Sequence, residues 1–289
     1  MDFAKFHDKY YKNLLLIPLV LLVLSFAYMG YFYYENGEFT KKDISLTGGT
    51  SITIYSKIDS NQLKQSLSDS LDNLDTRELF DLISQEQKGV ILSTTTDSQT
   101  AKQVLEDFLG YDLTDKNSSI EFTGSDLSES FYNQLLIAIL IAFLFMAIVV
   151  FVLFRSLVPS LAVVLSAFTD IFMTLAFINL IGMPLSSAGI VAFLMLIGYS
   201  VDTDILLTTR LLKRSGESLN RRIFGAFKTG ITMTLTSLLA VTFAFLVVRS
   251  FSVVLGQIFS ILIIGLAFDL LNTWVTNVSI LKWYVMEKK

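Results

Sequence analysis

The chain has 289 residues, of which 53% are hydrophobic and only 17% are charged, and its mean hydropathy is +0.59. This excess of apolar residues is too large for a typical soluble domain of that length. The absence of Cys excludes a disulfide-stapled scaffold, a cysteine nucleophile and a thiolate metal site, and the single His7 leaves little for imidazole chemistry. The formal net charge of -4 is distributed very unevenly along the chain.

Charge-free apolar runs dominate the sequence, and about 20 apolar residues suffice to cross the hydrocarbon core of a membrane. The first run, 14–34, follows a polar segment 1–13 and is too long for the core of a signal peptide, so it predicts a retained helix. Five further helices are predicted after residue 131, because Asn179–Pro184 supplies a turn that splits the longest run. Their approximate ranges are 133–154, 158–181, 185–209, 231–248 and 255–284, in a membrane domain of residues 132–284 that is followed by a tail, 285–289.

The polar stretch 35–131 is rich in Ser, Thr, Asp and Gln and predicts a folded domain between the first and second helices. Apolar spacing predicts two helices in it, one from a cap at Ser60 to about Gln87 and one at 98–109. Strands are predicted at 51–58, 89–96 and 119–124. The resulting β-α-β-α-β order is compatible with a ferredoxin-like sandwich. The expected fold is therefore an all-α membrane bundle of six transmembrane helices, one plus five, with an inserted ferredoxin-like α+β extracytoplasmic domain.

Charge segregation predicts how the chain lies in the membrane. Residues 35–131 carry 18 acidic and 8 basic side chains, whereas the rest of the chain carries 8 acidic and 14 basic ones. Most of the latter basic residues gather in one set of loops: Arg155, the segment Arg210–Lys228 and the segment Lys282–Lys289. By the positive-inside rule, we expect a multi-pass protein of the cytoplasmic membrane with both termini in the cytoplasm and residues 35–131 outside.

Two further segments could be taken for binding sites, but their residues do not favour that interpretation. Leu46–Thr50 (LTGGT) lacks the spacing and the Lys of a phosphate-binding loop, so nucleotide hydrolysis is not expected and a tight turn into the next strand is the simpler interpretation. Asn220–Lys228 mixes basic and apolar residues and predicts a short amphipathic helix on the cytoplasmic leaflet. Nucleic-acid binding is not expected there.

Carboxylates within the predicted membrane helices are the candidates for chemistry. Asp170 lies midway along the third helix, Asp202 and Asp204 lie in the fourth, and Asp269 lies in the sixth. A carboxylate at the centre of a membrane helix costs about 2.5 to 3.5 kcal/mol on insertion scales, so such residues usually face the protein interior and mark ion or proton paths. For Asp202 and Asp204, which lie nearer the cytoplasmic end, a water-filled cavity is the simpler alternative.

Polar side chains accompany these carboxylates along the helices. Ser200, Asp204 and Thr208 are four residues apart and share one helix face, whereas Asp202 points well away from Asp204. Lys228 lies at the entrance of the fifth helix, so we form a proton-relay hypothesis. Its members are Asp204, Asp202, Asp170 and Lys228, with polar support from Ser200, Thr203, Thr208, Asp269 and Asn272. Hydrogen bonding between helices is the preferred interpretation for the polar residues of the sixth helix: Asp269, Asn272 and Asn277.

Several motifs match a known family. LTGGT at 46–50, FRSLVPSLA at 154–162 and the pair Thr169-Asp170 follow its pattern, and IGYSVDTDILLTTR at 197–210 is the most specific match. FDLLNTWVTNVSILKWY at 268–284 resembles the closing helix of its archaeal branch. With its one-plus-five helices and inserted domain, the chain resembles the SecF family, the smaller half of the SecD–SecF protein-export complex, within the resistance-nodulation-division superfamily.

The chain departs from this family at the candidate site. Many bacterial relatives have Asn-Asp-Thr, with the Asp implicated in proton conduction, where this chain has Asp202, Thr203 and Asp204. The family position falls on Thr203, so either neighbouring Asp is a candidate for the role. The basic partner of bacterial members aligns near Thr229, with Lys228 adjacent.

The resemblance implies an accessory of the Sec translocon that, with a SecD-like membrane subunit, uses the proton gradient to assist a translocating polypeptide. It implies no enzyme activity, no catalytic residue, no cofactor and no metal. Six helices are half of what the superfamily needs for a pseudo-two-fold transporter, so an obligate partner of similar topology is expected. The alternatives are an exporter half for lipids or small molecules, a non-conducting assembly factor, and an intramembrane aspartyl protease, whose Gly-x-Gly-Asp signature is absent.

Overall fold

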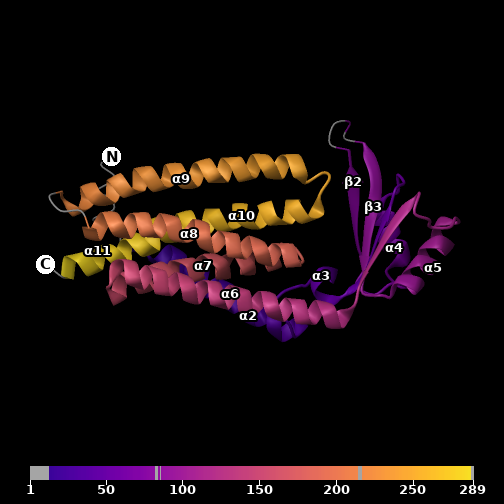
Figure 1. Ribbon diagram of the computed structural model, residues 1–289, viewed down its shortest axis with the longest axis horizontal. Coiled ribbons are helices and arrows are strands. Elements are labelled where there is room, and N and C mark those ends of the chain that lie inside the picture. The colour runs from indigo at the N-terminus through magenta and orange to yellow at the C-terminus, as the bar shows by residue number, and fades with distance from the viewer. Residues whose placement is uncertain (1–12, 82–83, 85, 214–216, 288–289) are drawn as a thin grey trace.

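The computed structural model describes residues 13–81, 84, 86–213 and 217–287. His7, residues 1–12 of the predicted segment 1–13 and residues 288–289 of the predicted tail 285–289 lie outside them. Figure 1 shows a bundle of long helices with a small sheet and two helices attached at one end. We call this the sheet end of the bundle, and the opposite end, where the chain reaches Glu287, the far end.

Within the residues that the structure describes, six helical spans are long and apolar enough to cross a membrane, the number that the sequence predicts. They are α2 (Leu16–Asn36), α6 (Ser125–Phe154), α7 (Leu157–Leu180), α8 (Ser187–Lys213), α9 (Leu219–Val248) and a last span made of α10 (Val253–Leu271), the π-helical turn η1 (Asn272–Asn277) and α11 (Val278–Glu287). Pro18 and Pro159 lie in the first turns of α2 and α7, where a backbone N–H is not needed for the helix.

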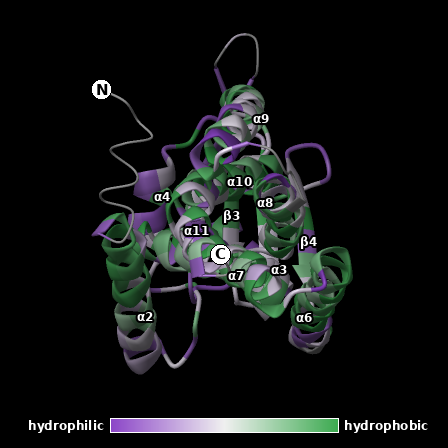
Figure 2. Cartoon of the chain, turned by 90° about the vertical axis from the view of Figure 1, so that its left-hand side faces the viewer, coloured by the Kyte–Doolittle hydropathy of each residue, from purple (hydrophilic) through white to green (hydrophobic). Residues whose placement is uncertain are grey.

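The spans differ in how much of their surface the bundle covers. In Figure 2, α7, α8, α10 and α11 lie in the middle, and α2, α6 and α9 lie at three corners. The most apolar window is 56% buried in α7 and α8, against 11% in α2 and α6 and 6% in α9. Polar side chains that must avoid lipid therefore have the middle of the bundle as their natural place.

The sheet domain contains four strands and two helices in the order β-α-β-β-α-β. They are β1 (Gly49–Ile54), α4 (Ser60–Leu67), β2 (Asp75–Phe80), β3 (Gln87–Thr94), α5 (Ser98–Leu109) and β4 (Ser118–Thr123). The strands are antiparallel in the order β2-β3-β1-β4. Its core is apolar and includes Ile52, Ile54, Leu63, Leu92 and Leu105, each fully buried.

The predicted helix from a cap at Ser60 to Gln87 begins where expected, but its length and its cap are wrong. The side chain of Asp59 caps α4 through the backbone N–H groups of Asn61 and Gln62, and α4 ends at Leu67. Residues 75–80 then form β2, which pairs with β3. The leucine spacing misleads because Leu71 and Leu74 still pack into the same core from the connection after the helix. The β-α-β-α-β order accordingly lacks one strand.

The predicted short helix Asn220–Lys228 is also corrected, because it forms the first turns of α9. Its apolar residues Ile223 and Ala226 are buried against Leu207 and Leu211 of α8. The amphipathic pattern reflects packing between two long helices, which requires the same one-sided apolar spacing as a helix lying on a membrane.

The LTGGT segment joins the two parts of the molecule. A short helix, α3 (Ile44–Thr47), is capped by Asp43 and ends at Gly48 with φ +81°, and Gly49 follows with φ +141°. A Cβ on Gly48 would overlap the backbone of Ser125 at the start of α6. The predicted tight turn into the first strand is confirmed, and glycine is required because the turn combines positive φ angles with close backbone contact.

Candidate functional site

Three of the four predicted membrane carboxylates converge in the middle of the bundle. Asp170 comes from α7, Asp204 from α8 and Asp269 from α10, and the solvent exposure of each is 0%. We call these three residues the carboxylate cluster. Their helices are the central ones of Figure 2, so the surrounding protein separates the cluster from the membrane.

Asp170 has a hydrogen-bond donor on each carboxylate oxygen. The Ser200 hydroxyl of α8 donates to Oδ2 at 2.6 Å, and the Asn272 amide of η1 donates to Oδ1 at 2.6 Å. Both donors are buried. Asp170 therefore ties α7 to the two helices beside it.

Asp204 and Asp269 share a donor. The Thr273 hydroxyl of η1 lies 2.8 Å from Asp204 Oδ1 and 3.1 Å from Asp269 Oδ1. The Asn277 amide also donates to Asp204 Oδ1 at 2.6 Å, while the Thr203 hydroxyl contacts the Asp269 carboxylate at 3.2 and 3.3 Å. One hydroxyl proton cannot serve two carboxylates fully, so this pair competes for Thr273.

Among the described residues, the hydrogen-bond partners of the carboxylate cluster are neutral groups. Within the described ranges, no Lys or Arg forms an ion pair with any of the three carboxylates. Burying an ionised carboxylate without a cation costs far more than burying its protonated form, and neighbouring carboxylates repel one another. The arrangement is therefore chemically suited to binding and releasing protons.

The polar network is less complete around Asp204 than around Asp170. Four buried polar atoms of this region have no hydrogen-bond partner among the residues that the structure describes: Asp204 Oδ2, Asn277 Oδ1, Thr208 Oγ1 and Ser166 Oγ. Thr208 and Asn277 follow Asp204 and Thr273 toward the far end of the bundle. The unsatisfied side of the site thus faces the far end.

The remaining predicted site residues lie apart from this cluster. Asp202 is exposed, because it projects from a different face of α8 than Asp204. Lys228 is exposed on α9. The neighbouring Thr229 accepts a hydrogen bond from Arg210 of α8 at 2.9 Å, which joins α8 to α9 instead of reaching the cluster.

Sequence reasoning missed Thr273 and Ser166. Thr273 follows Asp269 by four residues on the same helix, which is a usable signal for a shared face. The predicted hydrogen bonding of Asp269, Asn272 and Asn277 between helices is confirmed. No group of three His, Cys, Asp or Glu side chains in the described part of the chain is placed to hold a metal ion.

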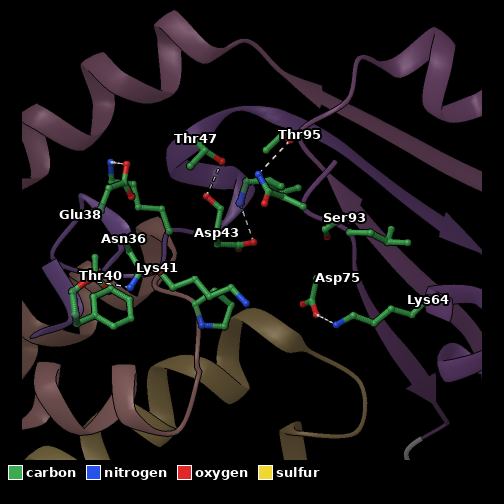
Figure 3. A pocket seen from close by; sticks show the side chains of 16 residues that line it. Asn36, Glu38, Thr40, Lys41, Asp43, Thr47, Lys64, Asp75, Ser93 and Thr95 are labelled. Atoms are coloured by element: carbon green, nitrogen blue, oxygen red, sulfur yellow. Dashed lines mark hydrogen bonds and ion pairs between the residues drawn. The ribbon is translucent and has the colours of Figure 1, made fainter. Parts of the chain in front are cut away.

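A separate cavity of about 760 Å³ lies between the sheet domain and the sheet end of the bundle (Figure 3). Its charged walls are largely paired, with Lys64 3.6 Å from Asp75 and Lys42 2.8 Å from Glu38. Asp43 caps α3 from this wall, and burial raises the pKa of its carboxyl. No member of the carboxylate cluster lines the cavity.

Comparison with known proteins identifies the family. Residues 103–287 match the family model for the C-terminal part of the protein-export membrane proteins SecD and SecF. The chain belongs to the SecD/SecF protein-export family. SecF from Methanocaldococcus jannaschii is 41% identical over 96% of this chain and 97% of its own length, and SecF from Methanolacinia petrolearia is 39% identical over 95% and 94%.

Solved structures agree in fold with this SecD/SecF family member. The crystal structure of SecDF, a translocon-associated membrane protein from Thermus thermophilus, matches with a TM-score of 0.75 at 16% identity and covers 98% of this chain. A second SecDF structure, in a super-membrane-facing form, matches with a TM-score of 0.60 at 17% identity. The chain spans only 38% and 39% of the two SecDF chains, respectively.

Proposed function

We propose that this multi-pass membrane protein is the SecF-like subunit of a SecD–SecF complex that assists Sec-dependent translocation, and that its carboxylate cluster couples this work to the proton gradient. The observation that carries the coupling is the set of three fully buried carboxylates partnered only by hydroxyl and amide groups. Burying an ionised carboxylate without a cation is costly, and protonation removes that cost. Binding and release of protons is therefore the chemistry that such a site favours.

The proposal includes an orientation in the membrane. The far end holds Arg155, Arg210 and the basic first turn of α9, whereas the sheet domain at the other end belongs to the acidic stretch 35–131. The positive-inside rule then puts the far end and both termini in the cytoplasm and the sheet domain outside. In this orientation, the unsatisfied polar atoms beside Asp204 face the cytoplasmic side and support proton release there.

A SecD-like membrane subunit is the proposed partner, and the Sec translocon and the translocating polypeptide are the proposed contacts of the complex. The family match and the SecDF structures support such a partner, because this chain spans 38% of a SecDF chain that it matches along 98% of its own length. The exposed apolar faces of α2, α6 and α9 leave room for helices of a second subunit as well as for lipid.

The sheet domain is proposed to be ferredoxin-like. Its β-α-β-β-α-β order and its fully antiparallel sheet support this assignment. The predicted order lacked β2. With β2 included, the sheet has four strands, and its topology is closer to that fold than the predicted order is.

The proton-relay proposal is tested by neutral substitutions in the full chain, reconstituted with its SecD-like partner and the translocon in vesicles that carry a proton gradient. Asp204→Asn and Asp170→Asn remove a titrating group from the cluster and keep the size of the side chain. We expect each to lower gradient-stimulated export at least about tenfold, equivalent to about 1.4 kcal/mol in the coupled step. Export is measured as protease-protected substrate, and proton uptake by a pH-sensitive dye inside the vesicles.

Asp202→Asn is the matched control, because Asp202 lies on the same helix as Asp204 but is exposed. It should leave both export and proton uptake within about twofold of wild type, as should Lys228→Gln. Full gradient-dependent export by Asp170→Asn, Asp204→Asn and Asp269→Asn would refute the relay.

A further inference from the structure

The π-helical turn η1 interrupts the last membrane span at the carboxylate cluster. The Val278 N–H donates to the carbonyl of Thr273, five residues before it, which is the π-helical pattern. Regular α-helix precedes the turn up to Leu271 and resumes at Val278. Single π-turns within α-helices are rare and occur frequently at functional sites.

This wider turn directs polar side chains to the cluster. In a regular α-helix, Asn272 and Asn277 would point about 140° apart, whereas residues five apart share a face in a π-turn. Both do reach the cluster: Asn272 donates to Asp170 and Asn277 to Asp204. Because Thr273 contacts Asp204 and Asp269, η1 supplies a hydrogen-bond partner to all three carboxylates.

Trp274 links the same turn to α9. Its ring meets Phe227 edge-on with the ring centroids 5.2 Å apart, and a Cβ on Gly230 would overlap the indole. Trp274 is 8% exposed and packs in the same apolar cluster as Ile223 and Ala226 of α9. The η1 turn therefore contacts the carboxylates through one set of side chains and α9 through another.

At its other end, α9 reaches the sheet domain. The loop that follows α9 presents the Ser250 carbonyl to the backbone N–H of Phe80 at the end of β2, at 2.9 Å. The most apolar window of α9 is only 6% buried, the lowest value of the six spans. A displacement of α9 therefore disrupts little buried packing along most of its length.

We propose that η1 transmits the protonation of the carboxylate cluster to α9, and through α9 to the sheet domain, with Trp274 as the positioning residue. The inference rests on the proposed proton relay. When Asp204 or Asp269 gains a proton, it acquires an O–H donor and becomes a weaker acceptor, so the Thr273 hydroxyl turns toward the carboxylate that is still ionised and η1 shifts with it. The elements around η1 also carry charged side chains, among them Asp202 and Arg210 of α8, Arg222 and Lys228 of α9 and the buried Lys282 of α11. No hydrogen bond or ion pair among the described residues joins Asp202, Arg210 or Lys228 to η1, whereas η1 is hydrogen-bonded to all three carboxylates.

Spin labels test the movement, and the absence of Cys makes specific labelling simple. Leu239→Cys on α9 and Leu140→Cys on α6 are both at positions 69% exposed. The labelled full chain is reconstituted with its SecD-like partner in vesicles. The distance between the two labels is then measured by pulsed electron paramagnetic resonance at acidic and alkaline pH. We expect the distance between the labels to change with pH, and Trp274→Ala to abolish this change while pH-dependent proton uptake persists. Trp283→Ala, at the other Trp of the chain, should retain both.

Gly230→Ala provides a second test that leaves Trp274 in place. The added methyl group should displace α9 from the indole. The distance between the labels should then change at both pH values and depend less on pH. Gly230→Ala combined with Trp274→Phe should restore the pH dependence of that distance. The proposal is overturned if Trp274→Ala keeps the pH-dependent distance change, or if wild type takes up protons with no distance change. Absence of proton uptake in wild type would instead refute the relay on which the inference rests.

Discussion

The sheet domain and the membrane bundle bury opposite kinds of side chain. The sheet domain has an apolar core around Ile52 and Leu92, and its ion pairs, such as Lys57 with Glu86 at 3.2 Å, are exposed. The bundle exposes many of its leucines and phenylalanines and buries Asp170, Asp204 and Asp269 in its middle. The two parts meet at the LTGGT turn.

This difference predicts that buried side chains contribute differently to stability in the two parts. In the sheet domain, apolar burial supplies the main driving force, so changes in its core should alter stability first. In the middle of the bundle, hydrogen bonds between helices contribute modestly to stability, because the unfolded chain in a membrane also finds polar partners. The polar middle of the bundle should therefore contribute less to the free energy of unfolding than the apolar core of the sheet domain does.

The largest expected effect comes from the sheet core. Leu92 of β3 is fully buried, so Leu92→Ala should lower the free energy of unfolding of the sheet domain by about 2 to 5 kcal/mol. Hydrogen exchange of the β1 and β3 amides in the full chain measures this loss. Leu239→Ala on α9, where the leucine is 69% exposed, should change stability by less than about 0.5 kcal/mol. Equal losses at the two sites would contradict the contrast.

The turn between the two parts should give an effect of similar size. Gly48→Ala places a side chain at φ +81° and against the Ser125 backbone. Gly48 has ψ 162° as well, a backbone region used almost only by glycine, so another residue there costs about 1 to 3 kcal/mol, and overpacking adds about 1 to 3 kcal/mol. Gly37→Ala is the control for a positive φ without crowding, since Gly37 lies in the left-handed region at φ +71° and has no atom within 4 Å of the added Cβ; a left-handed backbone there costs about 1 to 2 kcal/mol. Thermal unfolding in mild detergent should rank wild type above Gly37→Ala and Gly37→Ala above Gly48→Ala.

A smaller effect is expected for a single hydrogen bond inside the bundle. The Asn272 amide donates to Asp170 at 2.6 Å, so a cycle of Asp170→Leu, Asn272→Leu and the double variant isolates this pair. Its coupling energy should be about 0.6 to 1.7 kcal/mol, the range found for hydrogen bonds between membrane helices. Denaturant titration of the purified chain in micelles measures it. A coupling energy as large as the Leu92→Ala effect would remove the distinction between the two regions.

Predictions from the sequence agree best with the structure for features that lie within a single regular helix. The predicted shared face of Ser200, Asp204 and Thr208 is buried, and Asp202 is exposed, as an angle of 100° per residue requires. The number of long apolar helices is also correct, because membrane crossing imposes a minimum length of apolar residues. These features depend on local geometry alone.

Features that depend on tertiary packing were missed. Leu71 and Leu74 continue the leucine spacing of α4 but lie beyond the end of that helix, so the pattern concealed β2. Asn272 and Asn277 both reach carboxylates from within the π-turn, where the regular angle between residues used in sequence analysis does not hold. Lys228 is predicted at the entrance of its helix but lies within α9, and its exposed side chain is no partner of the cluster among described residues.

The smallest predicted effect uses two aspartates that cap helices in different surroundings. Asp43 caps α3 beside the bundle, where burial raises the pKa of its carboxyl above the ordinary 3.8. Asp97 caps α5 on the surface of the sheet domain, where hydrogen bonds from Thr100 and Gln99 lower the pKa of its carboxyl. The folded chain thus binds a proton more readily than the unfolded chain at Asp43, and less readily at Asp97.

These opposite shifts predict opposite slopes of stability with pH. The stability contributed by Asp43 is present at low pH and falls as the pH rises from 3.8 through its raised pKa, whereas that from Asp97 is present above 3.8 and is lost as the pH falls through its lowered pKa. Hydrogen exchange of α3 and α5 between about pH 7 and about pH 3, corrected for intrinsic rates, measures both. Asp43→Asn and Asp97→Asn keep a capping oxygen and should each flatten the slope only at their own helix. Slopes of the same sign at both helices would show that burial beside the bundle does not govern Asp43.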